Sequence, residues 1–269
     1  PPGTTWPPRQ ETEPVIGNWP GLWTLFAKEV KRFTVVFMQT VTAPVVSALL
    51  YLFIFSHALA GRVEVYPGVS YPQFLVPGLM MMTIIQNAFA NTSSSLIFSK
   101  VTGNIVFVLL APLSHLELYL GFVGAALVRS VVVSLGVYAV AFVYLGTTVA
   151  HPLPLLLFGL LGGLLLATCG LLAGIWADKF DQVATVQNFL ILPLTYLSGV
   201  FYSIHSLPQG WQALSRANPF FYLIDGFRYA FFGHSDVSPW LSAAVMAGAN
   251  LALSVLCLRL LSRGYKLRG

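Results

Sequence analysis

Charged side chains are scarce in this sequence. Asp, Glu, Lys and Arg make up 9% of the 269 residues, whereas 57% are hydrophobic and the mean hydropathy is +0.77. A water-soluble fold of this length would have too few polar side chains to cover its surface. The composition therefore predicts a polytopic membrane protein without a separate soluble domain. The formal net charge of +5 fits cationic loops beside an anionic leaflet, so no nucleic-acid partner is expected.

Several kinds of catalytic and metal-binding sequence are also absent. The two cysteines, Cys169 and Cys257, lie inside apolar segments, which excludes a disulfide framework and offers no metal spacing. None of the five histidines stands four residues from another ligand-type side chain. There is no G-x-x-x-x-G-K-[ST] phosphate loop and no G-x-S-x-G elbow. We therefore predict no catalytic residue, no metal site and no cofactor in this chain.

Long apolar stretches predict six membrane-spanning helices, because a bilayer core of about 30 Å takes roughly 20 helical residues. The stretches are approximately residues 34–58, 73–98, 117–146, 153–176, 183–203 and 239–261. Pro44 and Pro77 interrupt the first two. Membrane helices tolerate proline where neighbours satisfy the freed carbonyls, so both predict kinks rather than ends. The expected fold class is an all-α membrane protein with one transmembrane domain over residues 21–262.

The distribution of Lys and Arg predicts that both termini are cytoplasmic, because cytoplasmic loops carry the excess of these residues. With the amino terminus inside, the inner side holds ten of them and the outer side three. The inner ones are Arg9, Lys28, Lys31, Arg32, Lys100, Lys179, Arg259, Arg263, Lys266 and Arg268, and the outer ones are Arg62, Arg216 and Arg228.

The two ends of the chain differ from the spans. Residues 1–20 are rich in proline and charge and cannot bury enough surface to fold alone, so a disordered or draped tail is expected. Residues 21–33 place apolar side chains on one helical face, which predicts an amphipathic helix in the membrane interface; the alternative is the first turns of the next span. Its apolar stripe is Leu22, Phe26, Val30 and Phe33, and its charged residues are Lys28, Glu29, Lys31 and Arg32. Residues 263–269 would form a basic cytoplasmic tail.

One ionisable side chain lies deep in a predicted span. Arg129 is about 12 residues into the third span, roughly 18 Å along a helix. That position is costly unless the guanidinium faces protein or water. We favour a structural arginine bonded to carbonyls of neighbouring helices over a cation of a substrate path or interface. No carboxylate lies near the middle of a span, which argues against proton-coupled transport.

An apolar segment also lies in a predicted cytoplasmic loop. Residues 105–110 are too few to cross a membrane, and they follow Gly103 and precede Pro112. Exposed apolar surface of this kind is typical of a docking site for another protein. The alternative is an extension of the second span into the headgroups.

Residues 197–233, LSGVFYSIHSLPQGWQALSRANPFFYLIDGFRYAFFG, are too irregular for a span and too apolar for a loop. Ser206, followed three residues later by Gln209, suggests a capping box for a helix over 207–217. Asn218 followed by Pro219 predicts the N-cap and first turn of a second helix over 219–232.

Both of these helices are too short to span the membrane. We expect a re-entrant helical hairpin in the outer half of the bilayer, between the fifth and sixth spans, with Asp225 and Arg228 neutralising each other at i, i+3. The alternative is an amphipathic loop that lies flat on the outer surface.

Taken with three other segments, this stretch resembles the ABC type-2 exporter permeases. It is similar to the family pattern L-S-G-x-F, then L-P, then L-x-x-x-N-P, then D/G-x-x-R. LWTLFAKEVKRF, FLVPGLMMMTIIQNAFANTSSSL and NIVFVLLAPLS match in the expected order. The resemblance covers nearly all of residues 21–262.

The resemblance implies a permease of the bacterial inner membrane that forms a homodimer among membrane lipids. It would dock two copies of a separate ATP-binding-cassette subunit, on which ATP and Mg would bind. A coupling helix over about residues 103–113 would transmit motion through Asn104, Ile105, Phe107, Leu109 and Pro112. Relatives often place acidic residues in this segment, so its apolar sequence here implies an apolar contact. In the hairpin, Trp211, Asn218, Pro219, Asp225 and Arg228 would gate an exit or brace the dimer.

Three classes of function follow from these observations. The leading one is an ATP-driven export permease whose cargo is amphipathic, lipid-linked or drug-like, because the spans are largely apolar. The alternative is an ATP-independent secondary carrier or channel, for which Arg129 would be the main ionisable element. A membrane scaffold or membrane-bound enzyme forms the third class, and no catalytic cluster supports it.

Overall fold

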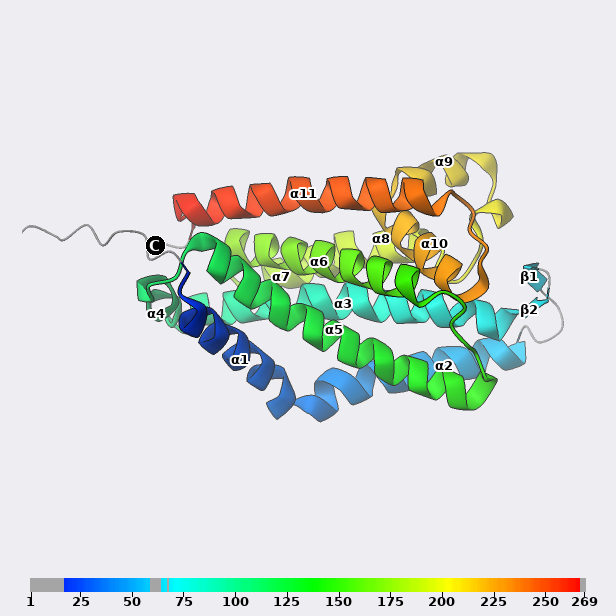
Figure 1. The fold of residues 1–269 in the computed structure, drawn as a ribbon, viewed down its shortest axis with the longest axis horizontal. Coiled ribbons are helices and arrows are strands. Elements are labelled where there is room, and N and C mark those ends of the chain that lie inside the picture. Colours follow the sequence, from blue (N-terminus) through cyan, green and yellow to red (C-terminus); the bar gives the residue numbers. More distant parts are fainter. Residues whose placement is uncertain (1–16, 59–63, 67, 267–269) are drawn as a thin grey trace, which may run out of the picture.

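Helices run lengthwise along one elongated bundle (Figure 1). The structure, a computed structural model, describes residues 17–58, 64–66 and 68–266. The longer helices are α1 (Trp19–Val35), α2 (Ala43–Ala58), α3 (Tyr71–Val101), α5 (His115–Leu145), α6 (Pro152–Trp176), α10 (Pro219–Phe232) and α11 (Pro239–Arg263). The shorter ones are η1 (Met38–Thr42), α4 (Ile105–Leu110), α7 (Phe180–Val186), η2 (Gln187–Ile191), α8 (Leu192–Leu197), η3 (Ile204–Ser206) and α9 (Gln209–Ala217).

A small antiparallel pair of strands, β1 (Glu64–Tyr66) and β2 (Val69–Ser70), is the only sheet in the described regions. The sequence pattern did not predict these strands. The pair lies at one end of the bundle, and α4 lies at the other; we call these the β1 end and the α4 end (Figure 1). The predicted class, an all-α membrane protein, is confirmed.

Five helical segments of the described chain are long and apolar enough to cross a membrane. They are Met38–Ala58, Tyr71–Val101, His115–Leu145, Pro152–Trp176 and Pro239–Arg263, and they match five of the six expected spans. The stretch expected over 183–203 is instead the continuous run of α7, η2 and α8, which ends at Leu197. Its first turn carries Asp181 and Gln182, and it does not meet the same requirement for length and apolarity.

α3 is the centre of the bundle. It packs against α5 and α6 and also meets α2 and α10. A Cβ on Gly170 of α6 would lie 2.3 Å from the carbonyl oxygen of Phe89 and from Oγ1 of Thr92. Thr92 Oγ1 also donates to the carbonyl of Ala167 at 2.8 Å. Such close contacts through small residues, with a hydrogen bond between helices, hold membrane helices together where the hydrophobic effect cannot.

Two prolines follow a turn of π-helix: Pro44 follows η1, and Pro193 follows η2. Each π-helical turn contains the residue four positions before its proline, Thr40 in η1 and Phe189 in η2. Because proline lacks an amide hydrogen and crowds the carbonyl four residues earlier, a wider turn at that place relieves the clash. α3 continues as an α-helix through Pro77. Pro44 and Pro77 therefore lie inside continuing helices, as predicted.

The segment expected as a hairpin forms α9 and α10. The prediction for Asn218 is confirmed, since its Oδ1 accepts from the amide of Phe220 at 3.0 Å. The predicted Ser206 capping box is wrong. α9 begins at Gln209 after Pro208, because Ser206 belongs to η3, where its amide already donates to the carbonyl of Ser203 at 3.0 Å.

Both ends of the described chain lie at the α4 end. α1 begins at Trp19, inside the segment predicted as a tail, because Asn18 Oδ1 accepts the amide of Gly21 at 3.0 Å and caps the helix. At the other terminus α11 continues to Arg263, and Nζ of Lys266 donates to Asp178 at 3.0 Å. The remainder of both predicted tails, residues 1–16 and 267–269, lies outside the described residues.

Replacing Gly170 by alanine tests the contact between α3 and α6. The added methyl group must displace the backbone of Phe89, so overpacking should lower the free energy of unfolding by about 1–3 kcal/mol, measured as a lower melting temperature in detergent. Gly248→Ala in α11 is the matched control, since the space around Gly248 is open and alanine favours helix. A similar loss in both variants would contradict the close contact.

Candidate functional site

α4 presents apolar side chains at its end of the bundle. Ile105 is buried against the bundle, whereas Phe107 and Leu110 are 74% and 76% exposed. Of the other predicted coupling residues, Leu109 is half-buried, and Asn104 and Pro112 are exposed. The helix spans Ile105–Leu110, which is shorter than the predicted 103–113.

Two clefts flank α4. One of about 740 Å³ lies between α4, Lys100 and Leu261 of α11. The other, of about 460 Å³, lies between α4 and the first turns of α1, where Gly21 and Lys28 line it. α4 therefore stands as an apolar ridge between two hollows, which is a shape suited to docking a partner.

Asn18 and Glu117 join the starts of α1 and α5 to the exit of α4. The amide of Asn18 donates to Oε1 of Glu117 at 2.5 Å, and Asn18 Nδ2 donates to the carbonyl of Pro112 at 3.0 Å. Oε2 of Glu117 accepts the amide of Ser114 at 2.7 Å, and Oγ of Ser114 accepts the amide of Glu117 at 3.2 Å. Ser114 and Glu117 thus form a capping box that also holds a distant helix. We call Asn18, Pro112, Ser114 and Glu117 the clamp.

α1 is amphipathic, and the side that packs on the bundle shares only Phe33 among its buried residues with the predicted stripe. Leu25, Glu29 and Phe33 are buried, whereas Phe26 and Val30 of the predicted stripe are half-buried. The physical reason is that Glu29 forms an ion pair, which lets a carboxylate occupy a position that a hydrophobic pattern assigns to an apolar side chain.

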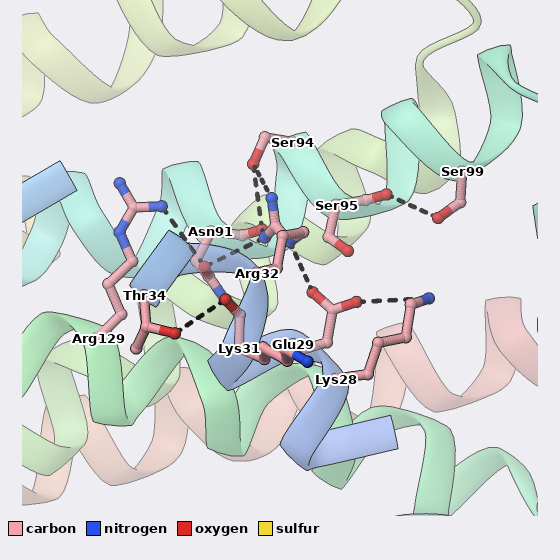
Figure 2. A network of polar contacts seen from close by, with 10 residues as sticks. All are labelled: Lys28, Glu29, Lys31, Arg32, Thr34, Asn91, Ser94, Ser95, Ser99 and Arg129. Carbon is pink, nitrogen blue, oxygen red and sulfur yellow. Dashed lines mark hydrogen bonds and ion pairs between the residues drawn. The ribbon is translucent and has the colours of Figure 1, made fainter. Parts of the chain in front are cut away.

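A polar cluster joins α1, α3 and α5 (Figure 2). We define it as Glu29, Arg32, Asn87, Asn91, Ser94 and Arg129. Nε of Arg32 donates to Oε2 of Glu29 at 3.0 Å, and Nη1 donates to Oγ of Ser94 at 3.2 Å. Nη2 of Arg32 donates to the carbonyl of Asn91 at 2.7 Å and to its Oδ1 at 3.1 Å. Lys28 and Lys31 of α1 are exposed outside the cluster.

Arg129 completes the polar cluster from α5. Its Nε donates to Oδ1 of Asn87 at 3.2 Å, and its Nη1 donates to Oδ1 of Asn91 at 3.4 Å. The guanidinium therefore faces protein, as expected for a structural arginine, and the carbonyl oxygens that it binds belong to side-chain amides rather than to the backbone. Nδ2 of Asn87 donates in turn to the carbonyl of Thr83 at 3.0 Å, so polar contacts continue along α3.

A cavity of about 420 Å³ lies between η1, α2 and α3 and includes Thr83. Its polar lining residues are Gln39, Ser47, Thr83 and Gln86, and its apolar ones include Pro44, Leu79 and Met82. Toward the β1 end, rings of α2 meet Phe201, which follows α8; Tyr51 and Phe55 each lie 5.6 Å from it between ring centres. A mixed wall of this kind suits an amphipathic molecule.

The charges of α10 do not pair as predicted. In the described chain no ion pair joins Asp225 to Arg228. The carboxylate of Asp225 accepts the amides of Asp236 and Val237 at 2.7 and 3.0 Å. Arg228 donates to the carbonyls of Gly199 and Val200, with its guanidinium carbon 3.8 Å from the ring centre of Phe74.

Asp225 and Arg228 are thus close enough to attract each other but form no direct ion pair, because each charge finds backbone partners in a neighbouring segment. Both side chains are only 1% exposed. Trp211 of α9, by contrast, is 55% exposed. Asp236 adds a further tie at this end, since it accepts hydrogen bonds from Tyr66 at 3.1 Å and from Oγ of Ser203 at 3.1 Å.

Two lysines close the carboxyl end of α6 at the α4 end. Nζ of Lys100 donates to the carbonyls of Ile175 and Ala177, and Nζ of Lys266 donates to the carbonyl of Trp176 at 3.0 Å. The hydrogen bond from Lys266 lowers the pKa of Asp178 below its ordinary value. Cations at a helix carboxyl end satisfy its free carbonyls and complement its dipole. In the described part of the chain, no three His, Cys, Asp or Glu side chains gather where they could hold a metal ion.

Sequence reasoning missed Asn18, Glu117, Asp236 and the asparagines of α3. Ser114 followed by Glu117 is a capping-box sequence, so the start of α5 carried a signal, but the bond to Asn18 joins residues 99 apart. Asn87 and Asn91 stand four residues apart, which places both on one face of a helix. Asp236 carried no signal, since its partners Tyr66, Ser203 and Asp225 come from separate segments of the chain.

Replacing Glu117 by glutamine tests the clamp. The amide group of glutamine presents a donor to one of two backbone N–H groups, so we expect α1 to loosen at its first turn. Loss of one charge-assisted hydrogen bond, about 2 kcal/mol, should raise amide hydrogen exchange at residues 18–22 by roughly tenfold or more. Asp181→Asn, at an exposed carboxylate of α7, is the control and should leave that exchange unchanged. Unaltered exchange in Glu117→Gln would show that Glu117 does not hold the start of α1.

Comparisons of the sequence with known proteins agree on one kind of protein, a membrane transporter. Residues 20–232 match the family described as ABC-2 type transporter. The inner membrane transport permease YadH of Escherichia coli K12 is 38% identical over 250 residues, which are 93% of this chain and 98% of YadH. Nodulation protein J of Rhizobium leguminosarum bv. trifolii is 28% identical over 195 residues, 70% of this chain and 72% of that protein.

The matched region runs from the first turn of α1 to the last residue of α10. It therefore contains α4, the polar cluster and the α9–α10 segment. The five long apolar helices of the described chain are those of a multi-pass membrane protein. The chain belongs to the ABC-2 type transporter family and is a transmembrane permease subunit of an ATP-binding-cassette exporter in the inner membrane.

Proposed function

We propose that the ATP-binding partner of this permease docks on α4 and that the cargo is amphipathic, lipid-linked or drug-like. The observation that carries the docking proposal is the exposed apolar ridge of α4, where Phe107 and Leu110 stand between two clefts. Permeases of this family generally work with an ATP-binding-cassette ATPase. The mixed wall of the cavity between α2 and α3 supports an amphipathic cargo.

Motion of α4 has a route into the membrane. The clamp joins the exit of α4 to the starts of α1 and α5. α1 in turn holds α3 through Arg32 and Asn91, and α3 lines the cavity. Closure of the ATP-binding subunits would thus shift α1 and α3 together. In this role Asn104, Ile105, Phe107, Leu109 and Pro112 form the docking segment.

We assign six crossings, with both termini in the cytoplasm. Both described ends lie at the α4 end, which requires an even number of crossings. Five apolar spans alone would place the two ends on opposite sides, so a sixth crossing is required. The helical run 180–197 fits this crossing, because it begins near Lys100 and Asp178 at the α4 end and ends beside α10. Its 18 helical residues extend about 27 Å, close to the thickness of a bilayer core. The excess of Lys and Arg at the α4 end supports a cytoplasmic position for that end.

We assign a homodimer with two ATP-binding subunits, on which ATP and Mg bind, and no nucleotide site to this chain. Gln86 and Gln39 line a cavity on the flank of α3, and lipid tails offer these amides no hydrogen bonds. A second copy that faces this flank would enclose them.

We assign α9 and α10 to a re-entrant hairpin with different roles for its two helices. α10 would brace the outer half of the permease, because Asp225 and Arg228 are buried and bonded to neighbouring segments. α9 would lie against lipid or a second copy, since Trp211 and Leu214 are exposed.

Replacing Phe107 by aspartate tests the docking of the ATP-binding subunit. A charge on the apolar ridge would have to lose its hydration at the contact, so co-purification of the partner and cargo-stimulated ATPase should fall about tenfold or more. Phe107→Leu keeps an apolar side chain and should retain both within about twofold.

Tyr265→Asp is the matched control for added charge. Tyr265 is 47% exposed at the same end of the bundle but lies outside α4. It should leave co-purification unchanged. Full complex and full ATPase in Phe107→Asp would place the partner elsewhere on the permease.

A further inference from the structure

Two cationic side chains from different helices meet at one oxygen inside the permease. Arg32 of α1 and Arg129 of α5 both donate to Oδ1 of Asn91, at 3.1 and 3.4 Å. Figure 2 shows the two guanidinium groups on either side of Asn91. One neutral amide oxygen thus accepts hydrogen bonds from two positively charged groups.

The charge of this group is not balanced. Glu29 pairs with Arg32 at 3.0 Å and with Lys28 at 3.9 Å. In the described chain no carboxylate lies within ion-pair distance of Arg129. An arginine within a membrane span normally has a counter-charge or water, because hydrocarbon does not solvate it. A net positive charge therefore remains at the level of Asn91.

Hydrogen-bond donors are also in excess. Asn91 is 1% exposed, and its Nδ2 is buried without an acceptor. Arg129 uses Nε and Nη1 on neutral amides alone. A phosphate or similar oxyanion supplies several acceptor oxygens and a negative charge, and guanidinium groups bind it through two parallel N–H donors.

The group is reachable from the membrane. The side chain of Arg32 is 32% exposed, and Arg129 is half-buried. Just beyond Arg32, the chain exposes an apolar surface at Val35, Val36, Phe37 and Met38. An acyl chain could lie on this surface while its headgroup reaches the two arginines.

We propose that Arg32, Arg129 and Asn91 bind the phosphate headgroup of an anionic amphiphile whose acyl chain lies along residues 35–38. The site is intramembrane and is formed by α1, α3 and α5. Two sources have this chemistry, a resident phospholipid of the inner leaflet and a phosphate-bearing cargo. Binding occurs on the permease itself and does not depend on the docking of the ATP-binding subunit.

The test uses purified permease in phosphatidylcholine nanodiscs, with spin-labelled phosphatidylglycerol as the probe and spin-labelled phosphatidylcholine as the reference. The wild type should prefer the phosphatidylglycerol probe by about tenfold, and Arg129→Gln should reduce the preference to about twofold or less. Lys31→Gln is the matched control, since it removes an exposed cation of α1 outside the polar cluster. It should keep the wild-type preference.

Asn91→Asp is a second variant that keeps the test decisive if Arg129→Gln does not accumulate. The new carboxylate balances the one positive charge that Glu29 leaves, so the melting temperature should rise while the preference for phosphatidylglycerol is lost. A preserved preference in Asn91→Asp, no preference in the wild type, or an equal loss in Lys31→Gln would each overturn the proposal.

The source of the headgroup is read from the complete exporter during ATP turnover. A probe that stays bound identifies a resident phospholipid, and a probe that is released identifies the headgroup of a carried amphiphile; both outcomes support a phosphate site. Because the binding measurement uses the permease alone, a negative result would leave co-purification of the ATP-binding subunit unaffected. The two proposals therefore fail separately.

Discussion

A polar side chain inside a membrane has no water to bind, and the interior of this permease depends on that constraint. α3 carries the largest share of buried polar residues, and each needs a partner from another helix or from its own turn. Thr92 binds the carbonyl of Ala167 in α6, and Asn91 binds arginines of α1 and α5. The polar side chains of α3 therefore favour the helices that surround it. A neighbouring helix without matching hydrogen-bond partners would leave a polar group of α3 unsatisfied in hydrocarbon.

The same constraint explains why α1 is more than a surface helix. A carboxylate on its buried side would be unfavourable alone, yet Glu29 becomes stable beside Arg32, which also binds α3. The clamp then fixes the other end of α1 to α4 and α5. Charge-assisted hydrogen bonds at both ends couple α1 to its neighbours, which is what the proposed transmission from α4 to the membrane interior needs.

The two ends of the bundle differ in the side chains that they bury and expose. At the β1 end, Asp225, Arg228 and Asp236 are buried and bonded to backbone groups or side chains of separate segments. Displacing any of them would leave a buried charge without partners, and the cost of that holds the segments in place. At the α4 end the clamp and the two lysines also bind backbone groups, but Phe107 and Leu110 of α4 itself are exposed. The geometry thus joins a β1 end whose segments are tied together by buried charges to an α4 end that exposes apolar side chains.

Hydropathy alone determined most of the architecture. Five spans and the N-cap at Asn218 were predictable because apolar runs and capping residues act locally in sequence. The motif order also identified the family. The sixth helical run was harder to place, since Asp181 and Gln182 lower its apolarity and its end is set by a turn after Leu197. Tertiary structure alone decided the partners of charged residues: Asp225 with Asp236, Glu117 with Asn18, and Arg129 with Asn87. Sequence spacing suggested that Asp225 would neutralise Arg228, but a buried charge binds whichever donor or acceptor the packed helices bring to it, and that choice involves residues far apart in the chain.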